Sequence, residues 1–268
     1  MDKLEQLKEQ LKSYQKVAIA YSGGCDSHFL YTVAKQTLGK ENVLAVICFG
    51  DMMSKEDIDS AKALLSDDHY EVINIDVLAI DAFRNNRKDR CYFCKKNIMS
   101  KVIERAHQRG FTKVLDGMNK DDQGVYRPGR KACQELNILS PLQHMYKSEI
   151  RNYSKQLQLS TAAKPANACL ASRFPYDTEL TKDKLMRLDS IESLLHQREI
   201  LHVRCRIHHD LVRIEAEKKD FDKIISDTVL IDEIKAYGFH YVTLDLKGIS
   251  SGSYDQLNNE TDMIHEVK

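Results

Sequence analysis

The stretch 17–27, which reads VAIAYSGGCDS, decides how the rest of the chain is organised. Its first four residues form a short apolar run, which predicts a strand buried on both faces. Gly23 and Gly24 then permit a tight turn and a close approach of the backbone to a ligand. Asp26 and Ser27 stand at the start of an expected helix. A strand, a glycine turn and a helix N-terminus together predict an anion-binding site, because unpaired N–H groups and the positive end of the helix dipole converge there.

The rest of the first half repeats the alternation of strand and helix. The expected helices cover residues 3–13, 27–39, 54–66, 95–109 and 147–157, and the further strands cover 42–49, 70–76 and 113–117. Strands separated by single helices are joined by right-handed crossovers into a parallel sheet. The sequence therefore predicts an α/β domain with a doubly wound parallel sheet over residues 1–165, and a smaller C-terminal α+β domain over 166–268.

Composition narrows the class of protein. The chain has 268 residues, with 40 basic and 40 acidic side chains, so no overall charge recruits nucleic acid or an acidic membrane. No run approaches the roughly 18 apolar residues that a membrane span needs, and the N-terminus lacks a signal-peptide core. We therefore expect a cytoplasmic protein. Its seven cysteines are then expected to be mostly reduced, which leaves them available for metal binding or catalysis.

Polar residues follow the strand expected at 113–117. Ligands of parallel sheets bind at the carboxyl ends of the strands, so Asp116, Gly117, Asp121 and Asp122 are expected to face a bound nucleotide. An exposed acidic loop is the alternative interpretation.

A pair of cysteines follows a charged stretch that ends in RNNRKDR and that composition predicts to be a solvated loop. Cys91 and Cys94 are three residues apart at an expected helix start, where two thiols can bind one metal centre and the helix terminus favours thiolates. Alone the pair is a weak signal. A structural zinc site would need four ligands, and a redox dithiol would need a thioredoxin-like pattern.

The stretch 163–176, AKPANACLASRFPY, fits neither helical nor strand periodicity and predicts an ordered loop. Cys169 lies at its centre, and Arg173 could offer positive charge to an anion or to a thiolate. A cysteine that fills a gap beneath a loop is the structural alternative.

The C-terminal part has its own pattern. A helix up to about residue 197, a strand hairpin at 201–207 and 211–216, a helix at 219–237 and a strand at 241–246 predict an α+β unit. On the first hairpin strand Arg204 and Arg206 share one face, and Cys205 points to the other, where we expect it to be buried. The two arginines either lie on a solvated face or form a phosphate clamp.

The glycine turn itself resembles a known loop. Ser22 to Ser27 read SGGCDS, which is similar to the S-G-G-x-D-S pyrophosphate loop of the PP-loop ATPases, also called N-type ATP pyrophosphatases. The dinucleotide pattern G-x-G-x-x-G and the Walker pattern are both absent. An ordinary glycine turn before a capped helix, without a bound ligand, is the structural alternative. Enzymes of this superfamily cleave ATP between the α and β phosphates and adenylate a carbonyl or carboxylate oxygen.

The order of motifs narrows this resemblance. SGGxDS, CYFCK, LDGxNxDD, YRPGR, KPAxACLASRFPY and a strand with paired arginines resemble, over about residues 3 to 255, the LarE group of ATP-dependent sulfur transferases. Met118 and Lys120 depart from the group's pattern. The resemblance implies adenylation of a carboxylate of pyridinium-3,5-biscarboxylic acid mononucleotide and its conversion to a thiocarboxylate for the nickel-pincer cofactor of lactate racemase. It also implies a homo-oligomer.

The resemblance also implies roles for individual residues. The residues that would bind ATP and Mg²⁺ are Ser22, Gly23, Gly24, Asp26, Ser27, Gly117 and Asp121. Asp26 would also act in catalysis, as would Cys169. The substrate would be bound by Arg173, Arg204 and Arg206.

Two branches of the group differ in the source of sulfur. In one branch three cysteines, here Cys91, Cys94 and Cys169, hold a four-iron four-sulfur cluster with one iron open to carry sulfide from a donor. In the other branch the cysteine that matches Cys169 attacks the acyl-adenylate itself, gives up its sulfur and becomes dehydroalanine. Because both members of the C-x-x-C pair are present, we favour the cluster.

Three other functions compete with this one. A PP-loop tRNA thiolase also uses three cysteines, but it would be expected to carry a basic surface or an RNA-binding module. An ammonia-using ligase of the NAD-synthetase kind has no use for the cysteines. A protein that senses nucleotide without turnover is the non-enzymatic alternative.

Overall fold

The strand that precedes the glycine turn, β1 (Val17–Ala20), lies inside a four-stranded parallel sheet. The computed structural model describes residues 2–65, 68–123, 128–165 and 168–249. The other strands of this sheet are β2 (Val43–Phe49), β3 (Tyr70–Asn74) and β4 (Lys113–Leu115), in the order β3-β2-β1-β4. Every pair of neighbours is parallel, which confirms the predicted α/β sheet. β1 is an inner strand, and β4 pairs with it in parallel at the end of the order, so the loops after these two strands meet at one edge of the sheet.

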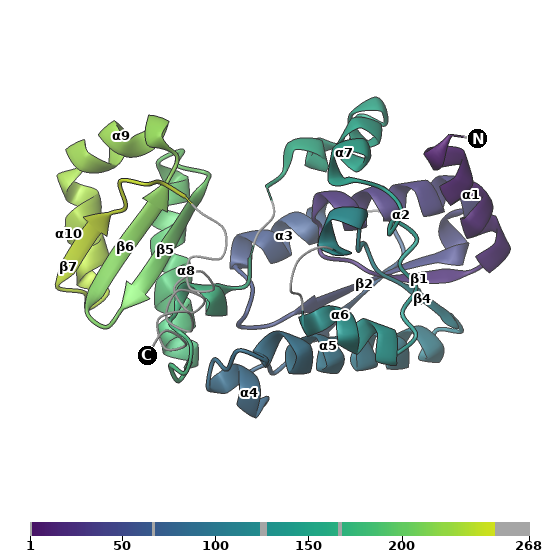
Figure 1. Cartoon of the computed structure of the whole chain (residues 1–268), viewed down its shortest axis with the longest axis horizontal. Helices are drawn as coiled ribbons and strands as arrows, with labels where there is room; N and C mark the ends of the chain where they lie inside the picture. Colours follow the sequence, from purple (N-terminus) through teal and green to yellow (C-terminus); the bar gives the residue numbers. More distant parts are fainter. Residues whose placement is uncertain (1, 66–67, 124–127, 166–167, 250–268) are drawn as a thin grey trace, which may run out of the picture. The chain divides into compact units, whose positions relative to one another are not determined.

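Helices cover both faces of this sheet (Figure 1). The helices of this part of the chain are α1 (Lys3–Tyr14), α2 (Cys25–Leu38), α3 (Lys55–Ala63), α4 (Asp81–Arg84), α5 (Arg90–Gln108), α6 (Pro128–Glu135) and α7 (Lys147–Gln156). Apolar residues of α1, α2, α3 and α7 pack on one face, and those of α5 and α6 pack on the other. The sheet is therefore doubly wound, as predicted.

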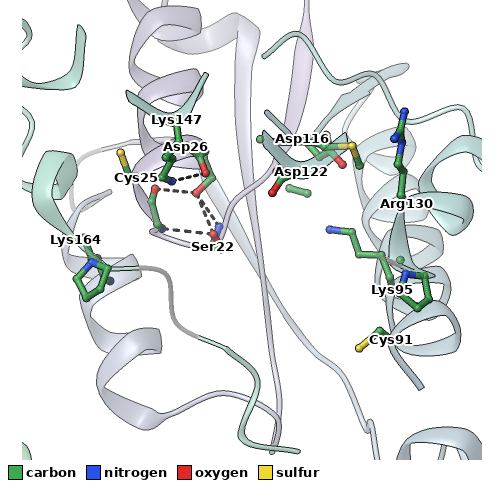
Figure 2. Close-up of a pocket in the computed structure, with 18 residues that line it drawn as sticks. Ser22, Cys25, Asp26, Cys91, Lys95, Asp116, Asp122, Arg130, Lys147 and Lys164 are labelled. Carbon is green, nitrogen blue, oxygen red and sulfur yellow. Dashed lines mark hydrogen bonds and ion pairs between the residues drawn. The ribbon is translucent and has the colours of Figure 1, made fainter. Parts of the chain in front are cut away.

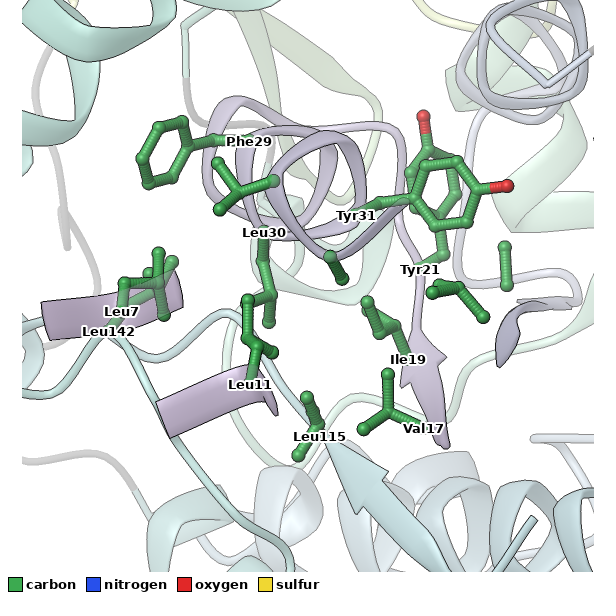
Figure 3. Close-up of a cluster of buried hydrophobic side chains, with 14 of the residues drawn as sticks. Leu7, Leu11, Val17, Ile19, Tyr21, Phe29, Leu30, Tyr31, Leu115 and Leu142 are labelled. Carbon is green, nitrogen blue, oxygen red and sulfur yellow. The ribbon is translucent and has the colours of Figure 1, made fainter. Parts of the chain in front are cut away.

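The side chains of β1 divide between the two layers. Val17 and Ile19 pack with α1 and α2 (Figure 3). Ala18 packs in the other layer, with residues of α5. This alternation follows from the two-residue period of a strand. On α2, Phe29 and Leu30 are fully buried, and burying a side chain of this size contributes about 1.5–3 kcal/mol. The glycine turn is thus held between a strand and a helix that are both anchored in the core.

The chain divides into two units. The first consists of Met1–Phe83 and Asp89–Asn167, and the second consists of Arg84–Lys88 and Ala168–Lys268. The segment 84–88 belongs with the second unit because Asn86 is fully buried there. Its Nδ2 donates to the carbonyl oxygens of Phe174 and Pro175 over 3.1 and 2.6 Å.

The second unit is a three-stranded sheet with helices. The strands are β5 (Val203–His208), β6 (Leu211–Ala216) and β7 (Tyr241–Leu244), and the helices are α8 (Lys182–Gln197), α9 (Phe221–Ser226) and α10 (Thr228–Ala236). β5 and β6 form the predicted antiparallel hairpin, and β7 runs parallel to β6. This is the smaller α+β part that the sequence predicts.

Two predicted elements differ from the structure. The helix expected over 219–237 is broken at Asp227, whose side chain accepts the backbone N–H of Leu230 over 2.8 Å and so starts a new helix. The charged stretch before Cys91 is not wholly irregular, because α4 (Asp81–Arg84) forms within it and buries Phe83. Among the residues that the structure describes, no helix has the length and apolar character needed to cross a membrane.

Candidate active site

The glycine turn lies between β1 and α2 and is closed by its own serines. Ser27 Oγ accepts the backbone N–H of Ser22 over 3.3 Å, lies 3.1 Å from Ser22 Oγ and donates to the carbonyl oxygen of Gly24 over 3.2 Å. The N-cap of α2 is Gly24, and none of the side chains that the structure describes caps this terminus. A helix end of this kind leaves first-turn amides directed at a ligand, so the turn has the form of an anion site.

Gly23 can only be glycine in this arrangement. Its φ is +69°, a backbone conformation that L-residues with a side chain rarely adopt. A Cβ added there would also lie 2.7 Å from Cβ of Ala61, so the turn packs directly against α3. Gly117 makes a second close approach, since its Cβ would lie 3.1 Å from the backbone nitrogen of Ser27. The turn after β4 therefore lies against the first turn of α2.

Asp26 is held from two sides. Its Oδ2 forms an ion pair of 2.6 Å with Lys147 Nζ and accepts a longer bond of 3.4 Å from Asn119 Nδ2. Lys147 begins α7, and its backbone N–H donates to Asp121 over 2.7 Å. The Oδ1 of Asp26 is buried and accepts no hydrogen bond from the residues that the structure describes. A buried carboxylate oxygen without a donor is unfavourable, so this atom fits a cation of the Mg²⁺ type, which prefers oxygen ligands.

A cavity of about 570 Å³ opens beside this turn (Figure 2). Its wall includes residues of the glycine turn, of the loop after β4, of α5 and of α6. Among them are Ser22, Gly24, Asp26, Ser27, Cys91, Asp116, Gly117 and Asp122. The cavity therefore brings one of the two paired cysteines to the predicted anion site, with Gly117 from the predicted nucleotide loop. Asp121 is not part of this wall, and its neighbour Asp122 is.

Four basic residues line the same cavity, and sequence reasoning missed all of them as site residues. They are Lys95, Arg130, Lys147 and Lys164. In Figure 2 Lys95 and Arg130 lie on one side of the cavity and Lys164 on the other. Arg130 belongs to YRPGR and Lys164 to KPAxAC, so the motifs held a signal that we did not use. Cations on opposite walls suit a ligand that carries several negative charges, such as a triphosphate.

Lys164 is tied to the glycine turn itself. Its Nζ donates to the carbonyl oxygen of Gly23 and to Ser60 Oγ, both over 3.3 Å, and lies 3.6 Å from a carboxylate oxygen of Asp57. Asp57 is also bonded to Ser54, the N-cap of α3, because the Ser54 hydroxyl donates to its carboxylate over 2.9 Å and accepts its backbone N–H over 3.1 Å. Lys164 thus links the turn to α3.

The seven cysteines divide into two groups. Cys91 is exposed in the first turn of α5 and lines the cavity, and Cys94 in the same turn is half-buried. Cys169 is half-buried and belongs to the second unit. The remaining cysteines are Cys25, Cys48, Cys133 and Cys205. Burial raises the pKa of Cys48 to about 12 and that of Cys133 to about 11, so these two thiols stay protonated at neutral pH.

Cys205 is fully buried, as predicted, and desolvation raises its pKa well above the usual value. Cys25 is also buried, and its Sγ lies 3.9 Å from the carbonyl oxygen of Ala162. These residues serve the core rather than the site.

The arginines of the second unit are not a solvated face. Arg206 is 2% exposed and forms an ion pair of 3.1 Å with Glu215. Arg173 is 4% exposed and pairs with Glu192 over 2.9 Å. Arg204, on the same strand as Arg206, is half-buried. The solvated-face alternative is therefore wrong for Arg206, because Glu215 on β6 supplies a buried partner that the alternating pattern did not reveal.

The predicted site residues fall into two sets. The nucleotide residues and the C-x-x-C pair lie in the first unit, whereas Cys169, Arg173, Arg204 and Arg206 lie in the second. In the part of the chain that the structure describes, no three His, Cys, Asp or Glu side chains are placed together to hold a metal ion. The thiols at 91 and 94 have the donor chemistry of an iron–sulfur site, and the third predicted ligand belongs to the other unit.

Comparison with known proteins agrees with this geometry. The profile of the NAD synthase family matches residues 2–112, the part that contains the glycine turn and the first three strands. Pyridinium-3,5-bisthiocarboxylic acid mononucleotide synthase of Lactiplantibacillus plantarum is 36% identical over 90% of this chain and 90% of its own length. Uncharacterized proteins of Synechocystis and Methanocaldococcus jannaschii are 34% and 30% identical, over 95% and 90% of this chain and 97% and 93% of their own lengths.

The similarity to the Lactiplantibacillus plantarum enzyme spans nearly the whole chain, and the first unit carries both the parallel sheet and the SGGxDS turn of the PP-loop superfamily. The chain therefore belongs to the LarE family of ATP-using sulfur transferases within the PP-loop superfamily.

Proposed function

We propose that this enzyme adenylates a carboxylate of pyridinium-3,5-biscarboxylic acid mononucleotide and converts it to a thiocarboxylate. The observation that carries the proposal is the single cavity that holds both the pyrophosphate turn and Cys91. A site for the triphosphate and a thiol beside it are the two parts that an adenylating sulfur transferase needs. The similar enzyme of Lactiplantibacillus plantarum is named for the bisthiocarboxylic acid mononucleotide that it makes.

In the first step a carboxylate oxygen of the substrate attacks the α-phosphorus of ATP, and pyrophosphate leaves. The backbone amides at the start of α2 bind the leaving pyrophosphate, and Lys147 and Lys164, which both line the cavity, provide positive charge. Mg²⁺, when bound, would neutralise further charge, with Asp26 and Asp122 as its carboxylate ligands. Lys147 pairs with the same Asp26 carboxylate over 2.6 Å.

In the second step a sulfur nucleophile attacks the acyl carbon, and AMP leaves with the oxygen that had been activated. A thiolate or sulfide forms readily at neutral pH and is a stronger nucleophile than water, so sulfur can attack the adenylated carbonyl. We propose Cys91, Cys94 and Cys169 as ligands of a four-iron four-sulfur cluster, which when bound would supply sulfide to this step. The support for the first two is their position in one helical turn, with Cys91 on the cavity.

A sacrificial Cys169 is the second candidate for the sulfur source. In that case the Cys169 sulfur forms the bond to the acyl carbon, and the Cβ–S bond of the cysteine then breaks to leave dehydroalanine. Anaerobic purification followed by iron and sulfide analysis separates the two. The cluster proposal expects iron and sulfide in the wild type and their loss in Cys91→Ala. Absence of iron together with dehydroalanine at position 169 after turnover supports the sacrificial cysteine instead.

The function itself is tested by a single turnover with MgATP and the pyridinium mononucleotide. Pyrophosphate and thiocarboxylate are expected in equal amounts, and Asp26→Asn is expected to lose both. Pyrophosphate release with tRNA and none with the mononucleotide would support a tRNA thiolase. No release with either compound, despite ATP binding, would support a nucleotide-binding protein without turnover. Sedimentation analysis tests the further prediction of a homo-oligomer.

A further inference from the structure

Asn119 lies in the loop after β4 and is 4% exposed, although its side chain is polar. Its Oδ1 accepts the backbone N–H of Asp121 over 2.9 Å, and its Nδ2 donates to Asp26 Oδ2 over 3.4 Å. The reverse orientation of the amide would set donor against donor and acceptor against acceptor, so both contacts favour this one. The backbone N–H of Asn119 donates to Asp122 Oδ2 over 3.1 Å. Asn119 therefore contacts both carboxylates that we propose as ligands of Mg²⁺.

The backbone is anchored on both sides of Asn119. Before it, the N–H of Met118 donates to Oδ1 of the buried Asp116 over 3.2 Å. After it, the N–H of Lys120 donates to the carbonyl oxygen of Met145 over 2.8 Å. The Asn119 side chain therefore starts from a fixed backbone position, which a residue that orients another side chain requires.

The contacts of Asn119 close into a ring that includes Asp26. Asp26 Oδ2 forms the ion pair of 2.6 Å with Lys147 Nζ, and the backbone N–H of Lys147 donates to Asp121 Oδ2 over 2.7 Å. The backbone N–H of Asp121 in turn donates to Asn119. Asn119 and Lys147 thus both bind Oδ2 of Asp26, whereas its Oδ1 is buried and accepts no hydrogen bond from the described residues. The two oxygens of this carboxylate are therefore used differently.

We propose that Asn119 is a positioning residue that, together with Lys147, keeps Oδ2 of Asp26 engaged and so leaves Oδ1 for the divalent cation of MgATP. The inference rests on the proposed function, because it concerns the Mg²⁺ site of that reaction. Its physical basis is that hydrogen bonds from neighbouring groups orient the carboxylates that bind metals. At 3.4 Å the bond from Nδ2 is weaker than the ion pair with Lys147, so we expect an effect at the lower end of the range for such residues.

The alternative is that Asn119 only shapes the loop. Its side-chain oxygen accepts the N–H two residues later, and this turn is common for Asn in loops. Serine forms the same turn more weakly through its hydroxyl, but its side chain ends one atom before the amide nitrogen that reaches Asp26. Asn119→Ser therefore keeps the turn and removes the bond to Asp26, without adding a charge.

Binding of Mn²⁺ together with α,β-methylene ATP measures the cation site without turnover, because Mn²⁺ takes oxygen ligands as Mg²⁺ does and is detected by EPR. Asn119→Ser is expected to raise the Kd for Mn²⁺ about 10-fold. Binding of the analogue in EDTA is expected to stay within about two-fold of wild type, because the amides at the start of α2 bind the phosphates. An unchanged Kd for Mn²⁺ would overturn the proposal. Equal weakening with and without the cation would also overturn it, since Asn119 would then serve the loop alone.

Asn152→Ser is the matched control, because it makes the same change at an exposed position of α7, the helix that Lys147 begins. Its Kd for Mn²⁺ is expected to stay within about two-fold of wild type. A change as large as that of Asn119→Ser would contradict a specific role for Asn119. Asn119→Thr, which also keeps a hydroxyl and fills more of the buried volume, covers the case in which the serine variant does not fold. Failure of both variants to fold would assign Asn119 to the loop structure and overturn the proposal.

The binding assay contains no mononucleotide, so the inference and the proposed function fail separately. The wild type is expected to bind Mn²⁺ in the presence of α,β-methylene ATP, and absence of this binding would overturn the inference. A wild type that binds the cation and the analogue but releases no pyrophosphate from MgATP with the mononucleotide would count against the proposed function instead, and would leave the role of Asn119 intact.

Discussion

Tyr21 and His28 stand immediately before and after the glycine turn (residues 22–27), and a hydrogen bond of 2.7 Å joins the Tyr21 hydroxyl to His28 Nδ1. Both side chains are buried. Desolvation lowers the pKa of His28 and raises that of Tyr21, so a neutral ring is hydrogen-bonded to a hydroxyl that keeps its proton. The six residues of the turn are thus closed off by two residues that are hydrogen-bonded to each other.

Loss of the Tyr21 hydroxyl is expected to destabilise the protein. Tyr21→Phe leaves His28 Nδ1 buried without its hydrogen-bond partner, and an unsatisfied buried polar group costs about 1–3 kcal/mol. Urea unfolding measures this change. Tyr14→Phe is the control, since the Tyr14 hydroxyl bonds Gln10 at the surface and its loss is expected to cost less than about 0.5 kcal/mol. Equal stability of the two variants would show that the Tyr21–His28 bond does not support the turn.

The two glycines of the turn are expected to respond differently to alanine. Gly23→Ala places a methyl group in a left-handed conformation and 2.7 Å from Ala61 Cβ, so we expect a loss of about 2 kcal/mol or more. Gly24 has φ −81°, and its nearest contact would be Ser22 Oγ at 3.4 Å. Gly24→Ala is therefore expected to cost less than about 1 kcal/mol in the same unfolding measurement. The reverse order would contradict the geometry of the turn.

Lys147 is expected to be needed for the adenylation step. Lys147→Met removes a cation from the cavity wall and leaves Asp26 without its partner, so the rate of pyrophosphate release should fall on the order of 100-fold to 1,000-fold. Quench-flow measurement of pyrophosphate gives this rate. Lys155→Met on the exposed side of the same helix should match the wild type. If both variants match the wild type, Lys147 is only a surface partner of Asp26.

Thiol labelling is expected to separate the cysteines of the site from those of the core. At about pH 8 a raised pKa keeps a thiol protonated and unreactive, so Cys48, Cys133 and Cys205 should remain unlabelled in the folded protein while the exposed Cys91 reacts. Raising the pH towards about 9 should leave this order unchanged, because burial raises the pKa of Cys48 to about 12 and that of Cys133 to about 11. Peptide mass spectrometry after alkylation measures each position. Labelling of Cys205 as fast as Cys91 would contradict the buried core of the second unit.

Most of the fold was predictable because its signals are local. Short apolar runs marked β1 and β2, and Ser54, a preferred N-cap residue, stands at the start of the helix predicted over 54–66. The break at Asp227 was missed although its signal was also local, since Asp is a preferred N-cap.

The cavity was harder to predict because its parts come from distant segments. Lys147 is 121 residues from Asp26, and Lys164 is 141 residues from Gly23, and no periodicity connects such positions. Burial of Arg206 was missed for a similar reason. The two-residue period of β5 shows which face of the strand Arg206 lies on. Only the contacts with Glu215 on the neighbouring strand and with the carbonyl oxygen of Ser172 show that this face is covered.

The path of oxygen during turnover tests most directly that ATP activates a carboxylate before sulfur arrives. A mononucleotide substrate labelled with oxygen-18 in its carboxylates is incubated with the enzyme and MgATP, and the nucleotide product is analysed by mass spectrometry. The account predicts AMP that carries a single labelled oxygen for each thiocarboxylate formed, because the activated oxygen leaves with AMP when sulfur attacks. Unlabelled AMP, or ADP and phosphate in place of AMP and pyrophosphate, would contradict it.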